Sequence, residues 1–313
     1  MINKKLLVSQ KTGFIAITGC VLFWGFSFIS TKIALAVFPP MSLGLLRFSI
    51  AIIFLYIIKR KLSPLEKLHL KDIPGLFAAG FTGVTLYFFF ENNGISLVSA
   101  SEASIAAGSI PALIMITEWL LGRLRVRRQK KTAHNGSTDN ETELQTVKAR
   151  QWIGCFVSIA GVWLVAGASF ALSGSIKGYI YMCGAAFSWA AYTFITRSLF
   201  KGHSVIFIVF WQSLAGLICF IPFSAVEFKN WGIPAAAVIF HIIFLAVFCS
   251  AAGHWFYVLA METLSVCVSG VFLNMIPVVT VVAGFFVLGE RLNPVQWFGS
   301  ALVICGVTLA MIW

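Results

Sequence analysis

The stretch from Trp24 to Phe48, WGFSFISTKIALAVFPPMSLGLLRF, indicates the fold class. It reads as one apolar helix that stops at a Pro-Pro pair and a second apolar helix that starts there. Each apolar run contains one full positive charge, Lys32 in the first and Arg47 in the second. A cation in hydrocarbon costs about 2.5–3.5 kcal/mol on insertion scales, so both residues are expected to face a partner or a watery cavity.

The composition excludes a soluble globular protein. The chain has 313 residues, of which 59% are hydrophobic and 11% charged, and its mean hydropathy is +0.91. Soluble domains carry about 25% charged residues. The net charge of +12 does not indicate nucleic-acid binding, because the basic residues fall in short connections between apolar runs. The seven cysteines lie in apolar segments without metal-ligand spacing, so they predict packing and neither a metal nor another cofactor.

Ten apolar runs have the length of about 20 residues that crosses a bilayer. The sequence therefore predicts an all-α membrane protein with spans at 14–37, 41–58, 73–93, 100–121, 151–168, 178–199, 204–223, 235–257, 266–288 and 295–313. The first run is too long for the core of a signal peptide, so it is expected to remain as the first span.

Lysine and arginine are distributed unevenly between the connections. Eighteen of the 23 lie in the N-terminal tail and in the connections 59–71, 123–150 and 197–201, whereas three lie in connections on the other side. Positive residues mark the cytoplasmic side of a membrane protein. We predict a multi-pass protein of the cell (inner) membrane with both termini in the cytoplasm.

The chain repeats itself at a nearly constant offset. The segment from Trp24 to Lys32 matches the segment from Trp189 to Arg197, 165 residues later, and the segments around Pro111 and Pro277 match in the same order. An odd number of spans per repeat inverts the second copy, which is typical of secondary transporters. The predicted parts are a first five-helix repeat (1–122 and 150–170), a cytoplasmic polar insertion (123–149) and a second, inverted five-helix repeat (176–313). The middle of the insertion, KTAHNGSTDNETE, is expected to be disordered.

These residues also carry a family resemblance. The pattern W-G-x-x-F-x-x-x-K, the Pro-Pro pair and L-x-x-L-R-F resemble the first hairpin of EamA-type members of the drug/metabolite transporter superfamily. SASEASIAAGSIPAL (99–113) resembles the family's fourth span, and FVLGERLNPVQWFGSALVICGV (286–307) its closing loop and tenth span. The resemblance implies a ten-helix exporter of small metabolites. The first repeat departs from the pattern, because it reads LLGRLRV where the second repeat has Glu290.

Polar and aromatic residues inside the spans are candidates for a central solute site. Hydroxyl and aromatic residues share one face of the first span and again of the sixth, and Glu102 and Ser109 share a face of the fourth. An asparagine in the ninth span needs hydrogen-bond partners. The expected solute-binding residues are Trp24, Ser27, Phe28, Thr31, Glu102, Ser109, Trp189, Tyr192 and Asn274. Helix packing is an equally good interpretation of several of them.

Four charges lie near the outer face: Lys32, Arg47, Glu91 and Glu102. We interpret Lys32, Arg47 and Glu91 as charge and gating residues that bind a zwitterion or take up a proton. The alternative is a structural ion-pair network that holds the hairpins together.

The sequence favours a secondary transporter that exports small metabolites, either amino acid-like or other small organic solutes, by alternating access. Its partners are a small solute and the lipid bilayer, with protons as a candidate coupling ion and no oligomeric state specified. A flippase for a lipid-linked sugar or phosphate is the alternative, in which the cations would hold a headgroup. A non-transporting sensor or scaffold is an alternative of another class. No enzyme motif is found.

Overall fold

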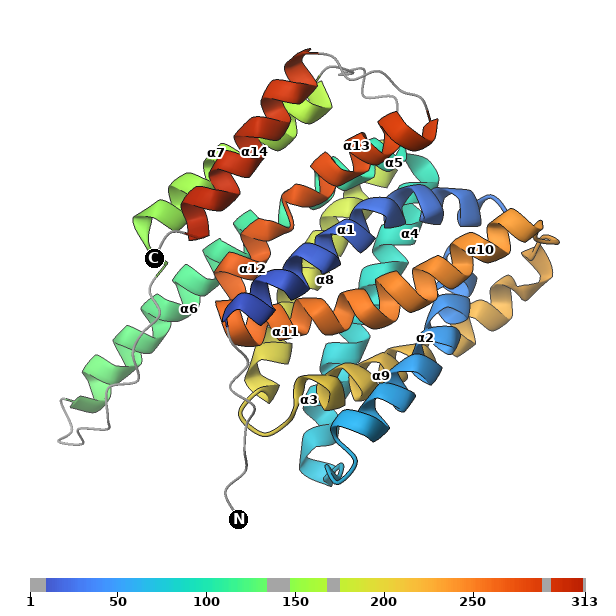
Figure 1. The fold of residues 1–313 in the computed structure, drawn as a ribbon. Coiled ribbons are helices and arrows are strands. Elements are labelled where there is room, and N and C mark those ends of the chain that lie inside the picture. The colour runs from blue at the N-terminus through green and yellow to red at the C-terminus, as the bar shows by residue number, and fades with distance from the viewer. Residues whose placement is uncertain (1–9, 134–146, 168–174, 289–293, 312–313) are drawn as a thin grey trace.

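The computed structural model describes residues 10–133, 147–167, 175–288 and 294–311, and these form an all-helical bundle without strands (Figure 1). The first half of the chain contains α1 (Gln10–Leu35), α2 (Pro40–Leu62), η1 (Leu70–Asp72), α3 (Ile73–Gly80), η2 (Phe81–Leu86), α4 (Tyr87–Leu97), α5 (Ala100–Ala107), α6 (Ile110–Ala133) and α7 (Ala149–Gly167). The second half contains α8 (Ile176–Leu199), α9 (Val205–Glu227), η3 (Phe228–Asn230), α10 (Ala236–Phe244), η4 (Leu245–Gly253), α11 (His254–Leu264), α12 (Val266–Phe272), α13 (Met275–Leu288) and α14 (Pro294–Met311).

Within the described residues, seven helical stretches are long and apolar enough to cross a membrane: Gln10–Leu35, Pro40–Leu62, Leu70–Leu97, Glu102–Leu124, Val205–Asn230, Ala236–Leu264 and Val266–Ala283. The same part of the chain has two shorter apolar helices, Ala149–Val165 and Pro294–Ala310. Helix α8 covers the remaining predicted span, 178–199. The chain is therefore a multi-pass membrane protein.

The elements of the two halves follow one another in the same order. Helices α2 and α9 both have 23 residues and begin 165 residues apart. The π-helical turn η2, between α3 and α4, has its counterpart in the π-helical turn η4, between α10 and α11. The break between α5 and α6 likewise corresponds to the break between α12 and α13. The repeat seen in the sequence therefore extends to irregular features of the helices.

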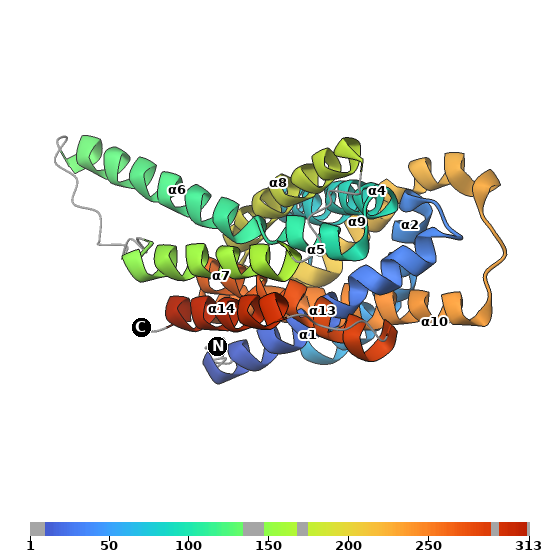
Figure 2. The ribbon, with the colours of Figure 1, turned by 90° about the horizontal axis from the view of Figure 1, so that it is seen from above.

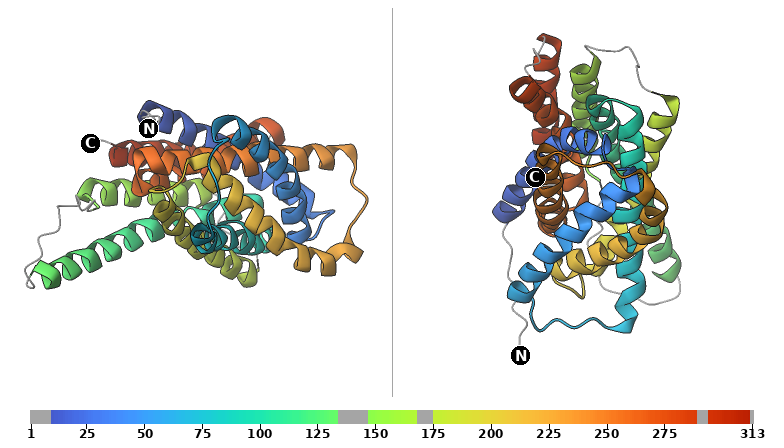
Figure 3. Two further views of the ribbon diagram at one scale, coloured as in Figure 1. Left: turned by 90° about the horizontal axis from the view of Figure 1, so that it is seen from below. Right: turned by 90° about the vertical axis from the view of Figure 1, so that its right-hand side faces the viewer.

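Helices α7 and α14 lie side by side and run in opposite directions (Figures 1 and 2). Their small residues allow close contact, since a Cβ on Gly161 of α7 would come 2.7 Å from the carbonyl oxygen of Gly299 in α14. Small residues at such a contact are what helix packing in lipid favours. Figures 2 and 3 show that the start of α1 and the end of α14 lie at the same end of the bundle.

Two predicted features differ in the structure. The fourth span was predicted to end at 121, but α6 continues to Ala133, because its RLRVRRQKK segment consists largely of strong helix formers; the first residues of the predicted insertion are therefore helical. The fourth span was predicted as one helix containing Pro111, but it breaks at Gly108 and Ser109, and α6 starts at Ile110. Proline is tolerated in the first turn of a helix, so the break spares the bundle an interior proline. The segment expected to be disordered and the G-E-R-L loop fall mainly on 134–146 and 289–293, outside the described residues.

Candidate functional site

A cavity lies between helices of both halves, with about 460 Å³ of empty space when its opening is included. Its walls are formed by Trp24, Ser27, Phe28, Arg47, Tyr87, Phe88, Glu91, Ala107, Ile110, Trp189, His254, Leu273 and Ile276. Most of the wall is apolar or aromatic, and the few polar groups are concentrated on α1, α2, α4 and α11.

Arg47 and Glu91 place opposite charges in this cavity. Their exposed fractions are only 2% and 6%. Arg47 Nε donates a hydrogen bond to Ser250 Oγ at 2.7 Å, and its guanidinium lies 4.3 Å from the centre of the Phe88 ring. The Tyr87 hydroxyl donates a hydrogen bond to Glu91 Oε1 at 2.7 Å. The two charges are thus held by different partners.

Arg47 and Glu91 do not form an ion pair with each other. In the described part of the chain, no carboxylate oxygen lies within 4.0 Å of the Arg47 guanidinium, although each charge acts electrostatically on the other. Among the described residues, Nε is the only Arg47 nitrogen with a hydrogen bond to a protein atom. Buried charges are costly unless they are paired. The arrangement therefore leaves both charges ready to pair with a third group in the cavity.

The π-helical turn η4 supplies the backbone of the site. The carbonyl oxygen of Cys249, inside η4, accepts a hydrogen bond from Trp24 Nε1 at 3.0 Å and lies 3.3 Å from His254 Nδ1. A carbonyl only accepts, so His254 carries its proton on Nδ1 when neutral, and Nε2 is then an acceptor. Short π-helical turns are common at functional sites.

His254 is enclosed by aromatic rings, with ring centres at 5.5 Å for Trp24, 5.7 Å for Phe48, 5.8 Å for Trp189 and 6.0 Å for Phe88. Its exposed fraction is 1%, and Nε2 has no hydrogen-bond partner. A buried acceptor without a partner costs about 1–3 kcal/mol. Since His254 lines the cavity, a donor group on a bound solute would remove that cost.

Each half of the chain contacts the π-helical turn of the other half. In one direction, Trp24 of α1 bonds to η4, and in the other, Ser188 of α8 donates to the Thr82 carbonyl oxygen of η2 at 2.7 Å. Glycines leave room for the aromatic rings at these contacts. If Gly253 carried a Cβ atom, that atom would lie 2.5 Å from Trp24 Nε1, and a Cβ atom on Gly83 would overlap the Tyr192 ring. Trp24 and Trp189 meet edge to face between the turns, with ring centres 5.1 Å apart.

We therefore predict that Gly253→Ala destabilises the protein. The added methyl group must displace the Trp24 indole, which is fixed by its hydrogen bond to Cys249 and by the Trp189 ring. Overpacking of this kind costs about 1–3 kcal/mol. The thermal unfolding midpoint in detergent should fall, whereas it should hold or rise for Gly122→Ala, where a Cβ meets no atom within 4 Å. Equal midpoints for the two variants would contradict the close contact.

The structure brings six of the predicted site residues to the cavity: Trp24, Ser27, Phe28, Trp189, Arg47 and Glu91. The other predicted residues lie elsewhere. Tyr192 packs on Trp189 with ring centres 4.9 Å apart and accepts a hydrogen bond from Gln212 at 2.8 Å. Thr31 is buried outside the cavity wall.

The remaining predictions fall on helix ends and breaks. Glu102 caps the start of α5 by accepting from Ser99 N at 2.8 Å, and it also accepts from the Tyr179 hydroxyl. Lys32 Nζ donates to the carbonyl oxygens of Ile95 and Val98, both at 2.6 Å, at the end of α4. These contacts give Glu102 and Lys32 structural partners.

Two further predicted residues lie beside helix breaks. The Ser109 hydroxyl donates to the Ala106 carbonyl oxygen at 2.8 Å. Asn274 Nδ2 donates to Ser158 Oγ at 2.6 Å, so it connects the break before α13 to α7.

Sequence reasoning did not select Tyr87, Phe88 and His254 as cavity residues. Tyr87 and Phe88 lie one helical turn before Glu91, so the spacing of four residues could have indicated that Tyr87 shares its face. No comparable signal existed for His254.

A family model for the EamA-like transporter family matches residues 11–130 and 176–312. The chain belongs to the EamA-like transporter family. The match is in two blocks that follow the two halves of the chain, and it agrees with the resemblance found in the sequence motifs.

Relatives are similar over nearly the whole chain. An uncharacterized transporter of Archaeoglobus fulgidus is 28% identical and covers 93% of this chain and 95% of its own length. The uncharacterized transporter YetK of Bacillus subtilis is 24% identical, over 98% and 89%. A probable terminal-alkyne amino-acid exporter of Streptantibioticus cattleyicolor is 23% identical, over 92% and 90%. A protein chain solved by crystallography has the same fold, with a TM-score of 0.76, 18% identity and coverage of 96% and 98%.

Proposed function

We propose that this transporter exports a small zwitterionic, amino acid-like solute through the central cavity by alternating access. The observation that carries the proposal is the pair of buried, opposite and mutually unpaired charges, Arg47 and Glu91, in one cavity between the two halves. A free α-amino acid presents a carboxylate and an ammonium group close together, which matches that pair.

The residues divide the recognition between them. The terminal nitrogens of Arg47 bind the solute carboxylate, because guanidinium and carboxylate form strong charge-assisted hydrogen bonds. Glu91, oriented by the Tyr87 hydroxyl, and His254 Nε2 accept hydrogen bonds from the ammonium group. Phe28, Phe88 and Ile276 leave an apolar wall for the solute side chain. The relative named as a probable amino-acid exporter supports this solute class.

The proposed topology is ten spans in two inverted five-helix repeats, with both termini in the cytoplasm. The matching order of elements, the equal lengths of α2 and α9 and the opposite directions of α7 and α14 support the inversion. The excess of basic residues in the connections at one side supports the orientation. Alternating access then exposes the cavity first at the basic end of the bundle and then at the opposite end.

The test is efflux from proteoliposomes preloaded with a mixture of amino acids, nucleosides and organic cations, with and without a pH gradient. We expect selective loss of one group of amino acids. Loss of nucleosides or cations alone would overturn the proposed solute class, and retention of every solute would overturn transport of small solutes. Dependence on the gradient would identify protons as the coupling ion.

A further inference from the structure

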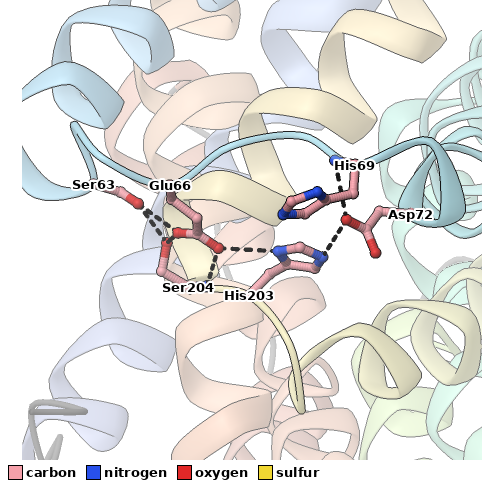
Figure 4. Close-up of polar contacts among 6 residues, drawn as sticks. All are labelled: Ser63, Glu66, His69, Asp72, His203 and Ser204. Carbon is pink, nitrogen blue, oxygen red and sulfur yellow. Dashed lines mark hydrogen bonds and ion pairs between the residues drawn. The ribbon is translucent and has the colours of Figure 1, made fainter. Parts of the chain in front are cut away.

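A polar cluster outside the cavity joins the two halves of the chain at the end of the bundle that carries the basic connections. Its members come from the connection between α2 and η1 (Ser63, Glu66), from η1 with its preceding residue (His69, Asp72) and from the turn between α8 and α9 (His203, Ser204), as Figure 4 shows. No function assigned above uses these residues.

His203 lies at the centre of the cluster, between two carboxylates (Figure 4). Its Nδ1 is 3.0 Å from Glu66 Oε1, and its Nε2 is 3.3 Å from Asp72 Oδ2. The imidazole stacks on the Phe207 ring, with centres 4.6 Å apart and an angle of 12°. A neutral imidazole can donate to only one of two carboxylates, whereas an imidazolium donates to both. The geometry therefore fits the protonated ring.

Glu66 also fixes the start of α9. It accepts from the backbone N–H of Ser204, the residue directly before α9, at 3.0 Å, and from the hydroxyls of Ser63 and Ser204. Burial by itself would raise the pKa of the Glu66 carboxyl, but the hydrogen bonds from Ser204, Ser63 and His203 outweigh burial and hold that pKa below its usual range. Glu66 therefore stays ionised near neutral pH. Its contribution to the stability of this end of the bundle is lost only as the pH falls through the lowered pKa.

At the opposite ends of α2 and α9, another carboxylate joins the two helices without a histidine; we call such a carboxylate contact a clip. Glu227, the last residue of α9, accepts from Ser42 N and Ser42 Oγ, both at 2.8 Å, and from Met41 N at 3.3 Å, at the start of α2. One carboxylate thus clips α2 to α9 at each end. Only the clip at the basic end includes a group that ordinarily changes its charge between about pH 5 and 8.

We propose that Glu66, His203 and Asp72 form a proton-sensitive latch that holds the basic end of the bundle closed, and that loss of the His203 proton releases it. Without that proton, one ring nitrogen of His203 presents a lone pair to Glu66 or Asp72. A hydrogen bond between the two halves is then replaced by electrostatic repulsion. The opposite clip keeps its neutral donors and stays closed. A rise in pH therefore favours opening at one end only.

The other charged groups around His203 do not replace its role. Lys59 Nζ lies 5.5 Å from the centre of the Phe207 ring, Lys71 is beside Asp72, and Arg197 pairs with Glu118 of α6. The backbone N–H of His69 donates to Asp72 Oδ2 at 3.2 Å, and Lys201 is in the same turn as His203. Lysine and arginine side chains do not ordinarily change charge between about pH 5 and 8.

The experiment measures the latch without any solute, because the proposal rests on the alternation of the two ends but not on what is carried. Spin labels are attached at the exposed positions Leu65 and Lys201 through a ketone-bearing amino acid, which leaves the seven native cysteines in place. A second pair at Ala36 and Ile233 reports on the opposite end. Distance distributions are recorded by pulsed electron paramagnetic resonance in lipid nanodiscs at about pH 6 and pH 8, on either side of the usual histidine titration.

We expect the Leu65–Lys201 pair to gain a longer-distance population, at least twofold larger at the higher pH, while the Ala36–Ile233 pair does not change. His203→Gln should abolish the pH response, and the matched variant Glu227→Gln should retain it. An unchanged wild-type distribution at the two pH values, or a pH response that persists in His203→Gln, would overturn the latch. A wild-type pH response together with no efflux of any solute would keep the latch and overturn the proposed function.

Discussion

Replacing Arg47 with methionine should reduce solute efflux from proteoliposomes at least tenfold. The variant removes the guanidinium that we propose binds the solute carboxylate, and it leaves Glu91 without an opposite charge in the cavity. Hydrogen bonds to charged groups contribute about 1.5–3 kcal/mol, and about 1.4 kcal/mol corresponds to tenfold in binding. Methionine has a similar length and packs in apolar surroundings, so the change tests the charge rather than the volume.

Two companion variants separate binding from folding. Arg47→Lys keeps the positive charge, so transport should fall less than in Arg47→Met. It should still fall, because lysine lacks the planar guanidinium that can bond to Ser250 and to a carboxylate at the same time. Lys32→Met removes the bonds to the end of α4, so its thermal midpoint should fall while the KM of the remaining transport stays the same. If Arg47→Met transports normally, or if Lys32→Met raises KM as much as Arg47→Met does, the assignment of the solute site is wrong.

Arg47 and Glu91 were predicted as functional residues because a charge within an apolar run is costly unless it faces a partner or a watery cavity. The same argument applied to Lys32 and Glu102, but Lys32 bonds to carbonyl oxygens at the end of α4, and Glu102 accepts from the Ser99 N–H at the start of α5 and from the Tyr179 hydroxyl. Helix ends present unpaired carbonyls and N–H groups. Which side chain reaches them depends on how neighbouring helices are packed, and the spacing of charges along the sequence carries no information about this.

His254 could not be placed from helical periodicity. It follows directly after η4, where nine residues are wound as a π-helix, and this winding changes the face on which later residues lie. A regular helix drawn through 235–257 therefore assigns the wrong face after Gly253. The internal repeat could be recognised because it preserves residue types at a fixed offset, whereas the π-helical turns leave no residue pattern of their own.

The latch lies in connections, where apolar periodicity gives no guidance. Glu66 and His203 are 137 residues apart in the sequence, and each is preceded or followed by ordinary loop residues. Their meeting depends on the antiparallel packing of α2 against α9 along their whole length. Once that pairing is known, a carboxylate after α2 and a serine before α9 are expected to lie close together.

Glu118→Gln should lower the stability of the protein by about 3 kcal/mol, which is the low end of the cost of breaking a buried ion pair. Glu118 of α6 lies 2.6 Å from Arg197 Nη1, in the last turn of α8, and the exposed fractions of their side chains are 3% and 23%. Because Arg197 reaches solvent, part of its charge remains hydrated in the variant, which keeps the cost at the low end. The measurement is the thermal midpoint in detergent, with an expected decrease of about 5 °C or more.

The double variant Glu118→Met with Arg197→Met is the matched control. Replacing both members of an ion pair with apolar residues of similar size is often neutral or stabilising, whereas removing one member leaves a charge without its partner. The double variant should therefore be more stable than Glu118→Gln. The pair joins the fourth span of the first half to the first helix of the second, and Arg197 occupies the position that Lys32 has in the first half. A double variant no more stable than Glu118→Gln would contradict this account. The contact between the two halves at this point would then not be stabilised by the pairing of the two charges.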